Sequence, residues 1–411
     1  MQAEIQINNS LDRQARYLGW APSPCRIRLT DTSGMPAQAS SVQVRLSAKA
    51  VSGGGKVRFI AASGGVSKPT IKVDLNREGS SAQFLVVGQF GRASVNDGDV
   101  TIQADVRNQV IGAVPVMVRV RKDATKLTAG ERDRFVSALA QLNNQGSGRF
   151  ADFRNMHVNA GSPEAHGAAA FLPWHRAYLL DLERELQAID PSVSLPYWRF
   201  DKSAAALFKR NYLGEADSLG VLQWSATNPL QFWVTDGQQG INRRPLFTTS
   251  NSGANVISEA ATLALGANYS AFRNMEGNPH GSAHTSFGGF ISSIGTAARD
   301  PLFFLLHCNV DRLWAKWQAA NNRFDVATAA SYDSGGPGGN RIGHNLPDTM
   351  WPWNGITGAP RPSTAPGGNL AASPCVSAPG PSPRVRDNLD YQGRVASAAR
   401  MGFDYFDVAF A

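Results

Sequence analysis

Residues 300–317 read DPLFFLLHCNVDRLWAKW, and this stretch decides the class of the C-terminal part of the chain. Asp300 and Pro301 are a capping residue and a first-turn proline, an order that favours the start of a helix. The apolar residues that follow recur at helical spacing and share one stripe with His307. A histidine on a core-facing stripe loses its hydration and needs a polar partner or a metal ion. The stretch therefore predicts a buried helix that directs a histidine into the core.

Six of the seven histidines lie between positions 157 and 307, and the first 156 residues contain none. His280 and His284 are four residues apart, so we expect both imidazoles on one face of a helix. His175 lies on the apolar face of a second predicted helix, over residues 171–189. The seventh, His344, has no such companions and is interpreted as a loop histidine. The six form two triplets, which are His157, His166 and His175, and His280, His284 and His307.

The ligand type of these triplets limits which metal they are expected to bind. One histidine alone is best explained by an ordinary hydrogen bond, but six in two groups favour metal binding. Imidazole triplets without cysteine or carboxylate suit copper or zinc, and they argue against a di-iron carboxylate site. The stretch His280–His284 lacks the glutamate of a His-Glu-x-x-His zinc protease. Two three-histidine sites leave open positions on both ions, as oxygen chemistry between two coppers requires.

The N-terminal part of the chain has a different pattern. Between about residues 25 and 120, apolar and polar residues alternate in roughly seven segments, separated by turn clusters rich in Gly, Asn and Asp. This spacing is typical of an antiparallel sandwich. At Thr128 the period changes, because Thr128 and Glu131 form a capping box ahead of an apolar pattern of helical period. A second domain therefore begins just before Thr128.

Composition limits the partners. The 411 residues allow two or three domains, and the net charge of +8 is scattered along the chain, which argues against a nucleic-acid partner. No apolar run approaches the roughly 18–20 residues of a membrane span, and the first twenty residues lack the apolar run of a signal peptide. We therefore expect a soluble, cytoplasmic protein with no membrane partner; export on a carrier protein is the alternative. Oligomeric state and the pairing of Cys25 with Cys375 stay open.

Two stretches resemble the copper-binding motifs of tyrosinases and polyphenol oxidases, a family of type-3 dicopper proteins. HGAAAFLPWHRAYL, residues 166–179, is similar to the first motif, and residues 300–311 are similar to the second. The resemblance covers residues 118–411 and implies a tyrosinase-like dicopper catalytic domain there, a mainly α-helical four-helix bundle with long loops. Residues 1–117 lie outside it, as an all-β sandwich accessory domain.

The resemblance also implies the cofactors and the activity. His157, His166 and His175 would bind the first copper ion (Cu A), and His280, His284 and His307 the second (Cu B). The implied reaction is oxidation of phenols, o-diphenols or o-aminophenols by O2 to o-quinones, and ortho-hydroxylation of monophenols is left open. Phenolic small molecules and O2 are thus the expected partners. A reversible oxygen carrier resembling hemocyanin is the alternative, and a dizinc hydrolase is a more distant one.

Further site residues follow from the same resemblance. Glu276 falls where family members often carry a glutamate that holds a water near the metals, so it is the candidate catalytic residue; an ordinary surface glutamate is the alternative. Gly281, Ile294 and Phe303 are placed at the substrate pocket, and Phe303 is also expected to pack against the histidines. Many members that hydroxylate monophenols have Asn at the position of Gly281.

Two more positions bear on the histidines. Asp311 lies one turn after His307 and would either pair with Arg176 or orient a metal ligand. Glu164 lies two residues before His166, where some family members have a cysteine that forms a thioether with a histidine, so this chain cannot form that bond.

Overall fold

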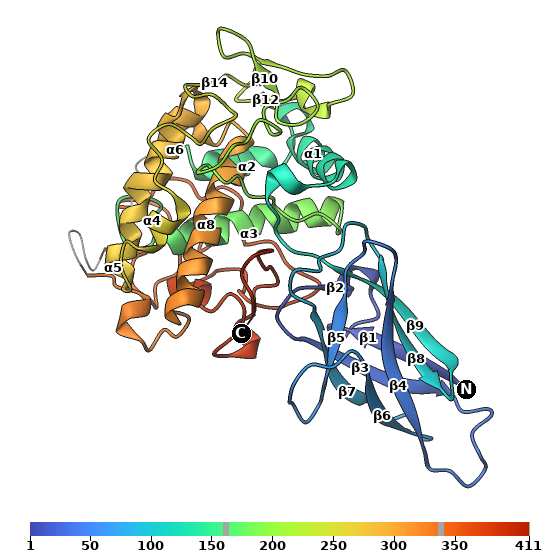
Figure 1. Cartoon of the computed structure of the whole chain (residues 1–411). Coiled ribbons are helices and arrows are strands. Elements are labelled where there is room, and N and C mark those ends of the chain that lie inside the picture. The colour runs from blue at the N-terminus through green and yellow to red at the C-terminus, as the bar shows by residue number, and fades with distance from the viewer. Residues whose placement is uncertain (159–163, 336–340, 411) are drawn as a thin grey trace. The chain divides into compact units, whose positions relative to one another are not determined.

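The computed structural model describes residues 1–158, 164–335 and 341–410. The chain divides into two compact units, which Figure 1 draws. The first contains Met1–Val120, Ser373–Ser377 and Arg400–Ala411, and the second contains Arg121–Ala372 and Ala378–Ala399. The domains expected from the sequence were 1–117 and 118–411. The first unit thus also includes two segments from the C-terminal part of the chain.

The first unit is built from two β-sheets. One sheet has four strands in the order β1-β3-β7-β5, and the other has five in the order β2-β9-β8-β4-β6. Strands β2 and β9 pair in parallel, and the remaining pairs are antiparallel. The strands are β1 (Gln2–Ile7), β2 (Tyr17–Leu18), β3 (Ser23–Asp31), β4 (Ser41–Ala50), β5 (Val57–Ala61), β6 (Ile71–Asn76), β7 (Ala82–Gly88), β8 (Val100–Val106) and β9 (Gln109–Val118).

The alternating sequence pattern matches burial on the strands. In β3, Ile27 is buried whereas its neighbours Arg26 and Arg28 are exposed. One hydrophobic cluster contains buried residues of both sheets, among them Val86 from the four-stranded sheet and Ile102 from the five-stranded sheet. Period two therefore buries one face of each strand in a shared core, and the predicted all-β N-terminal part is confirmed.

Buried hydrogen bonds join the C-terminal segment to this unit. The Trp20 backbone N–H donates to Asp404 Oδ2 at 2.7 Å, and the Trp20 indole Nε1–H donates to the Tyr405 carbonyl at 2.9 Å. Gly19 leaves room for the Asp404 carboxylate, because a Cβ there would overlap it. These residues are more than 380 positions apart in the sequence, so no local pattern could predict the contact.

The second unit is mainly helical, as predicted (Figure 1). Helix α1 begins at the expected capping box, in which the Thr128 N–H donates to Glu131 Oε2 at 2.9 Å and the Glu131 N–H donates to Thr128 Oγ1 at 3.3 Å. The helices are α1 (Ala129–Asn143), α2 (Phe150–Met156), α3 (Phe171–Ile189), α4 (Glu259–Leu263), α5 (Tyr269–Phe272), α6 (Ser282–Thr285), α7 (Ile294–Ala297) and α8 (Leu302–Asn321). Short strands lie between them, namely β10 (Glu215–Ala216), β11 (Leu222–Gln223), β12 (Val234–Thr235), β13 (Gln238–Gln239), β14 (Arg243–Pro245) and β15 (Phe287–Gly289).

A buried ion-pair network joins α3 to α8. Arg176 Nε donates to Asp311 Oδ1 at 2.6 Å, so the expected pairing of these two residues is confirmed. Arg121 contacts Glu183 of α3 at 2.7 Å and Asp311 of α8 at 3.2 Å, and this link was not expected. All four side chains are buried. Because buried charges need partners, the network holds α3 and α8, which carry His175 and His307, in one arrangement.

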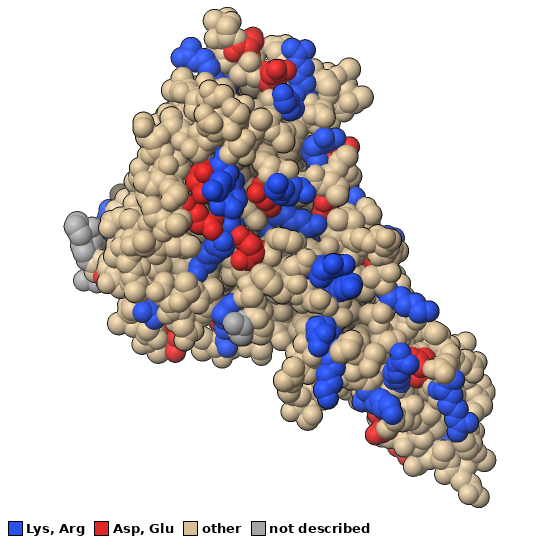
Figure 2. Space-filling model, in the orientation of Figure 1, with Lys and Arg blue, Asp and Glu red and all other residues tan. Residues whose placement is uncertain are grey.

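Charges are mixed on the molecular surface. Lys and Arg side chains are scattered over the face drawn in Figure 2, and several lie beside Asp or Glu. Among the described residues, none of the helices combines the length and the apolar character needed to cross a membrane.

Candidate metal centre

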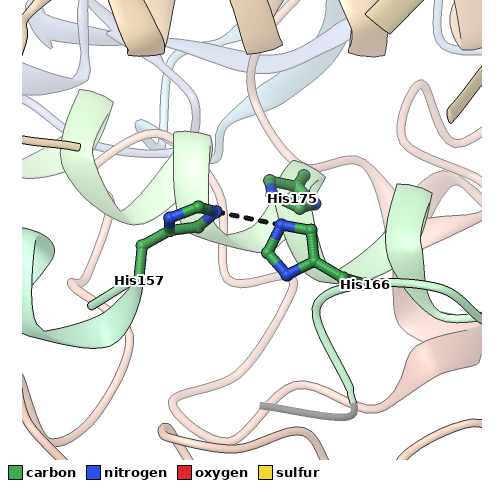
Figure 3. Close-up of side chains that lie close together, drawn as sticks. All are labelled: His157, His166 and His175. Carbon is green, nitrogen blue, oxygen red and sulfur yellow. Dashed lines mark hydrogen bonds between the residues drawn. The ribbon is translucent and has the colours of Figure 1, made fainter. Parts of the chain in front are cut away.

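Three segments bring the first triplet together. His157 directly follows α2, His166 lies in the irregular segment before α3, and His175 lies in α3. The Nε2 atoms of His157 and His166 are 3.1 Å apart. One nitrogen from each of the three rings lies within 4.8 Å of the others, and Figure 3 shows the three rings gathered around one point.

The second triplet has the same compactness. His280 lies in a π-helical turn (Gly277–Gly281), His284 lies in α6, and His307 lies in α8. His307 Nε2 is 3.3 Å from His280 Nε2 and 3.2 Å from His284 Nε2. The expected placement of His280 and His284 on one helical face is thus realised across two short helical turns. Both triplets predicted from the sequence exist as groups of converging nitrogen atoms.

Backbone carbonyl groups orient three of the rings. His175 Nδ1 is 2.9 Å from the Phe171 carbonyl, and His280 Nδ1 is 2.7 Å from the Glu276 carbonyl. His284 Nδ1 is 2.6 Å from the Ile291 carbonyl. A carbonyl only accepts, so each Nδ1 carries the proton and each Nε2 presents a lone pair to its triplet. Oriented imidazoles of this kind are typical of metal ligands.

Burial keeps the histidines neutral. Removal from water lowers the pKa of all six, to about 4 for His166 and His284 and well below the ordinary value for the other four. A neutral ring needs to release no proton from its free nitrogen before it binds a cation. The electrostatics of the centre therefore favour metal binding at neutral pH.

The spacing of nitrogen atoms tests whether a metal ion fits. Two nitrogen ligands about 2.0–2.1 Å from one ion, at a roughly tetrahedral angle, are about 3.3 Å apart. The close Nε2 pairs are 3.1–3.3 Å apart. In the second triplet, the Nε2 lone pairs of His280 and His284 both point at His307 Nε2. A proton on His307 Nε2 would form a hydrogen bond with one of these lone pairs and leave the other without a donor. A cation would accept lone pairs from all three rings, and the buried His175 Nε2 has no hydrogen-bond partner among the described residues.

The two triplets lie next to each other. The rings of His175 and His307, one from each triplet, are stacked with centroids 4.2 Å apart. Phe303 is fully buried, and its ring centroid lies 4.3 Å from that of His307 and 4.6 Å from that of His157. Its expected packing against the histidines is thus observed.

The remaining predicted site residues are Glu276, Gly281 and Ile294. Glu276 Oε1 accepts a hydrogen bond of 2.6 Å from the Gly167 N–H, beside His166, and burial raises the pKa of its carboxyl group. Gly281 directly follows His280, and a Cβ there would meet the Glu276 carbonyl oxygen at 3.4 Å. Ile294 is 48% exposed at the start of α7.

Sequence reasoning missed the residues that support the His166 segment. The Ala170 N–H donates to His344 Nδ1 at 3.0 Å, so His344 is more than a loop histidine. The Tyr269 hydroxyl donates to the Ala169 carbonyl. An isolated histidine and an isolated tyrosine carry no pattern, so the sequence contains no signal for these contacts.

Comparisons with known proteins agree with this geometry. The family described as "Common central domain of tyrosinase" matches residues 147–320. The chain is 36% identical to a tyrosinase of Streptomyces glaucescens over an alignment of 266 positions that covers 57% of this chain and 92% of that protein. It is 33% identical to a tyrosinase of Streptomyces antibioticus over an alignment of 272 positions that covers 58% of this chain and 94% of that protein. Hemocyanin 2 of Megathura crenulata is 29% identical over an alignment of 233 positions that covers 50% of this chain and 6% of that protein.

The six imidazole ligands, the spacing of their nitrogen atoms and these similarities all indicate a dicopper protein. The chain belongs to the tyrosinase family of type-3 copper proteins, and its cofactors are two copper ions.

Proposed function

We propose that this protein oxidises phenolic compounds with O2 and converts o-diphenols to o-quinones. The adjacent pair of three-histidine clusters carries the proposal, because two copper ions with open positions suit the two-electron oxidation of a diphenol. Two relatives that match over more than nine-tenths of their own length bear the name tyrosinase, which supports it further.

Each triplet would hold one ion. His157, His166 and His175 would bind the first copper, and His280, His284 and His307 the second. When bound, the two copper ions supply the redox chemistry with O2 that zinc does not offer. The protein's part is to hold six neutral imidazoles rigidly, through α3, α8 and the carbonyl groups that orient the rings.

Glu276 is the proposed proton acceptor for the phenol. Its raised pKa lies closer to neutral pH than that of an ordinary glutamate, which suits a general base. The Gly167 N–H holds one of its oxygen atoms beside the His166 segment. The side chain is 18% exposed, so water can reach it.

Access to the centre is the proposed role of two further residues. The small Gly281 leaves space beside His280, and the half-exposed Ile294 would limit the size of the ring that enters. Phe303 is fully buried among the histidines, which favours its packing role over contact with substrate.

Oxygen uptake tests the proposal. The copper-loaded protein is supplied with catechol, phenol and o-aminophenol in separate assays, with metal-free protein as the control. We expect copper-dependent oxygen consumption on catechol. Inert copper-loaded protein on all three substrates would refute the oxidase.

The similarity to hemocyanin 2 favours a second candidate, a reversible oxygen carrier. A carrier would show an absorption change on exposure to O2 that reverses on removal of O2, with no quinone formed.

A further inference from the structure

His166 is supported differently from His175 and His307. His175 and His307 lie within long helices, whereas His166 lies in turns and bends before α3. A ligand outside a helix has no ladder of backbone hydrogen bonds to hold it in place. Contacts from other segments must therefore fix its position.

One such contact is made by Glu164, two residues before His166. Its side chain is buried, and Oε1 accepts a hydrogen bond of 2.6 Å from Arg361 Nε while Oε2 accepts one of 2.7 Å from the Trp351 N–H. Gly343 has a φ of +84°, and a Cβ there would overlap the Glu164 carboxyl group. The backbone near residue 343 thus approaches Glu164 as closely as only glycine permits.

A second contact lies after His166. His344 is 1% exposed, and its Nδ1 accepts a hydrogen bond of 3.0 Å from the N–H of Ala170, the residue before α3. The Tyr332 hydroxyl donates to the His344 carbonyl at 2.7 Å, which holds His344 itself. Residues 343–361 therefore hold the described segment 164–170 on both sides of His166.

We infer that Glu164 and His344 are positioning residues for His166 and so tune copper binding at the first triplet. His344 and the two partners of Glu164, Trp351 and Arg361, lie in residues 343–361, beyond the part that matches the tyrosinase central domain, residues 147–320. Neither side chain acts as a ligand in this arrangement, because Glu164 contacts Trp351 and Arg361 and His344 contacts the Ala170 N–H. The inference rests on the proposed role of His166 as a copper ligand.

Substitution of His344 separates positioning from simple packing. His344→Leu removes the acceptor for the Ala170 N–H, whereas His344→Asn places an amide oxygen close to where Nδ1 lies. Loss of a residue that orients a ligand typically weakens metal binding about 10–100-fold. We expect His344→Leu to lower the affinity for one of the two copper ions about tenfold, in line with that range. We expect His344→Asn to retain most of the wild-type affinity.

The measurement is a copper(I) titration of the metal-free full-length protein against a competing chelator, which reports copper per chain and both affinities. Asn228→Leu is the matched control, because Asn228 is buried and donates to the Arg210 and Tyr212 carbonyls of the same unit. Thermal unfolding of the metal-free variants reports stability separately. A purely structural role would lower the unfolding temperature of His344→Leu and of the control alike, with both copper affinities unchanged.

Unchanged copper affinities in His344→Leu, or equal loss in His344→Leu and His344→Asn, would overturn the inference. If His344→Leu does not fold, Glu164→Gln takes its place, because it keeps one oxygen acceptor and loses the charge opposite Arg361. The same loss of affinity for one copper ion is then expected. Wild-type protein that binds fewer than two copper ions would instead refute the proposed copper ligands, so the two failures are distinguishable.

Discussion

The imidazole rings of His175 and His307 stack face to face, with centroids 4.2 Å apart and 13° between their planes. His175 belongs to the first triplet and His307 to the second, so this contact joins the two metal sites. Their helices, α3 and α8, are also joined by the Arg176–Asp311 ion pair. The spacing of the two sites is therefore set by the packing of one pair of helices.

Removal of one ligand should empty one site. In His307→Ala the second triplet keeps two imidazoles, and we expect copper content to fall from two ions to about one per chain. Oxidase turnover should drop at least about tenfold, since loss of an orienting residue alone costs about 10–100-fold. Metal analysis and oxygen uptake check this, with Arg210→Ala as a surface control. A variant with two coppers and full turnover would contradict the assignment of His307.

Metal exchange should separate binding from redox chemistry. Zinc accepts three-histidine sites but has no redox chemistry. We expect chelation to abolish oxygen uptake, copper to restore it, and zinc to restore stability against heat without restoring turnover. Turnover by the zinc-loaded protein would contradict copper-based oxidation.

Arg121 should be a large contributor to stability. Arg121→Met leaves Glu183 and Asp311 buried without one of their cationic partners, and breaking such a pair costs about 3–5 kcal/mol. Unfolding in urea measures the free-energy change. Arg210→Met is the control, because its ion pair with Glu215 is largely exposed and should contribute less than about 1 kcal/mol. Equal effects of the two substitutions would contradict a structural role for the buried network.

Gly281→Asn should change substrate preference. The backbone of Gly281 is helical (φ −58°, ψ −39°), so a side chain causes no strain there. Many family members that hydroxylate monophenols have Asn at this position, by the resemblance described above. We expect the ratio of turnover on phenol to turnover on catechol to rise. Gly281→Ala controls for bulk, and the same rise in Gly281→Ala would argue against a specific role for the amide.

Acid should destabilise the metal-free protein. Burial lowers the pKa of His166 and His284 to about 4, whereas an unfolded histidine titrates near about 6.5. Between these values the unfolded chain binds more protons, so the free energy of unfolding rises with pH. Each of the two contributes a slope of up to about 1.4 kcal/mol per pH unit. Urea unfolding at pH 7.5 and pH 5 tests this, and His166→Gln should show a smaller slope.

Local patterns predicted much of the fold. The period-two segments became β-strands, the Thr128 capping box opened α1, and His280 and His284 converged through their spacing. These features depend on neighbours within a few residues, so the sequence displays them directly.

Other features depend on residues far apart in the chain. Asp404 accepts a hydrogen bond from the Trp20 N–H. Arg121 forms ion pairs with Glu183 and Asp311. His344 accepts a hydrogen bond from the Ala170 N–H, in the segment that carries His166. Each is a single polar residue whose partner is set by packing. No periodicity marks such a residue before the chain has folded.

The order of residues alone predicts the two classes of secondary structure, the two histidine triplets and the family. Hydrophobic periodicity and ligand spacing involve residues that are close together in the sequence, so both can be recognised without a structure. Folding places the two triplets next to each other and brings residues 343–361 against Glu164 and Ala170, on either side of His166. Those relationships arise when buried polar groups from distant segments must find partners, and that requirement is met only in the folded chain.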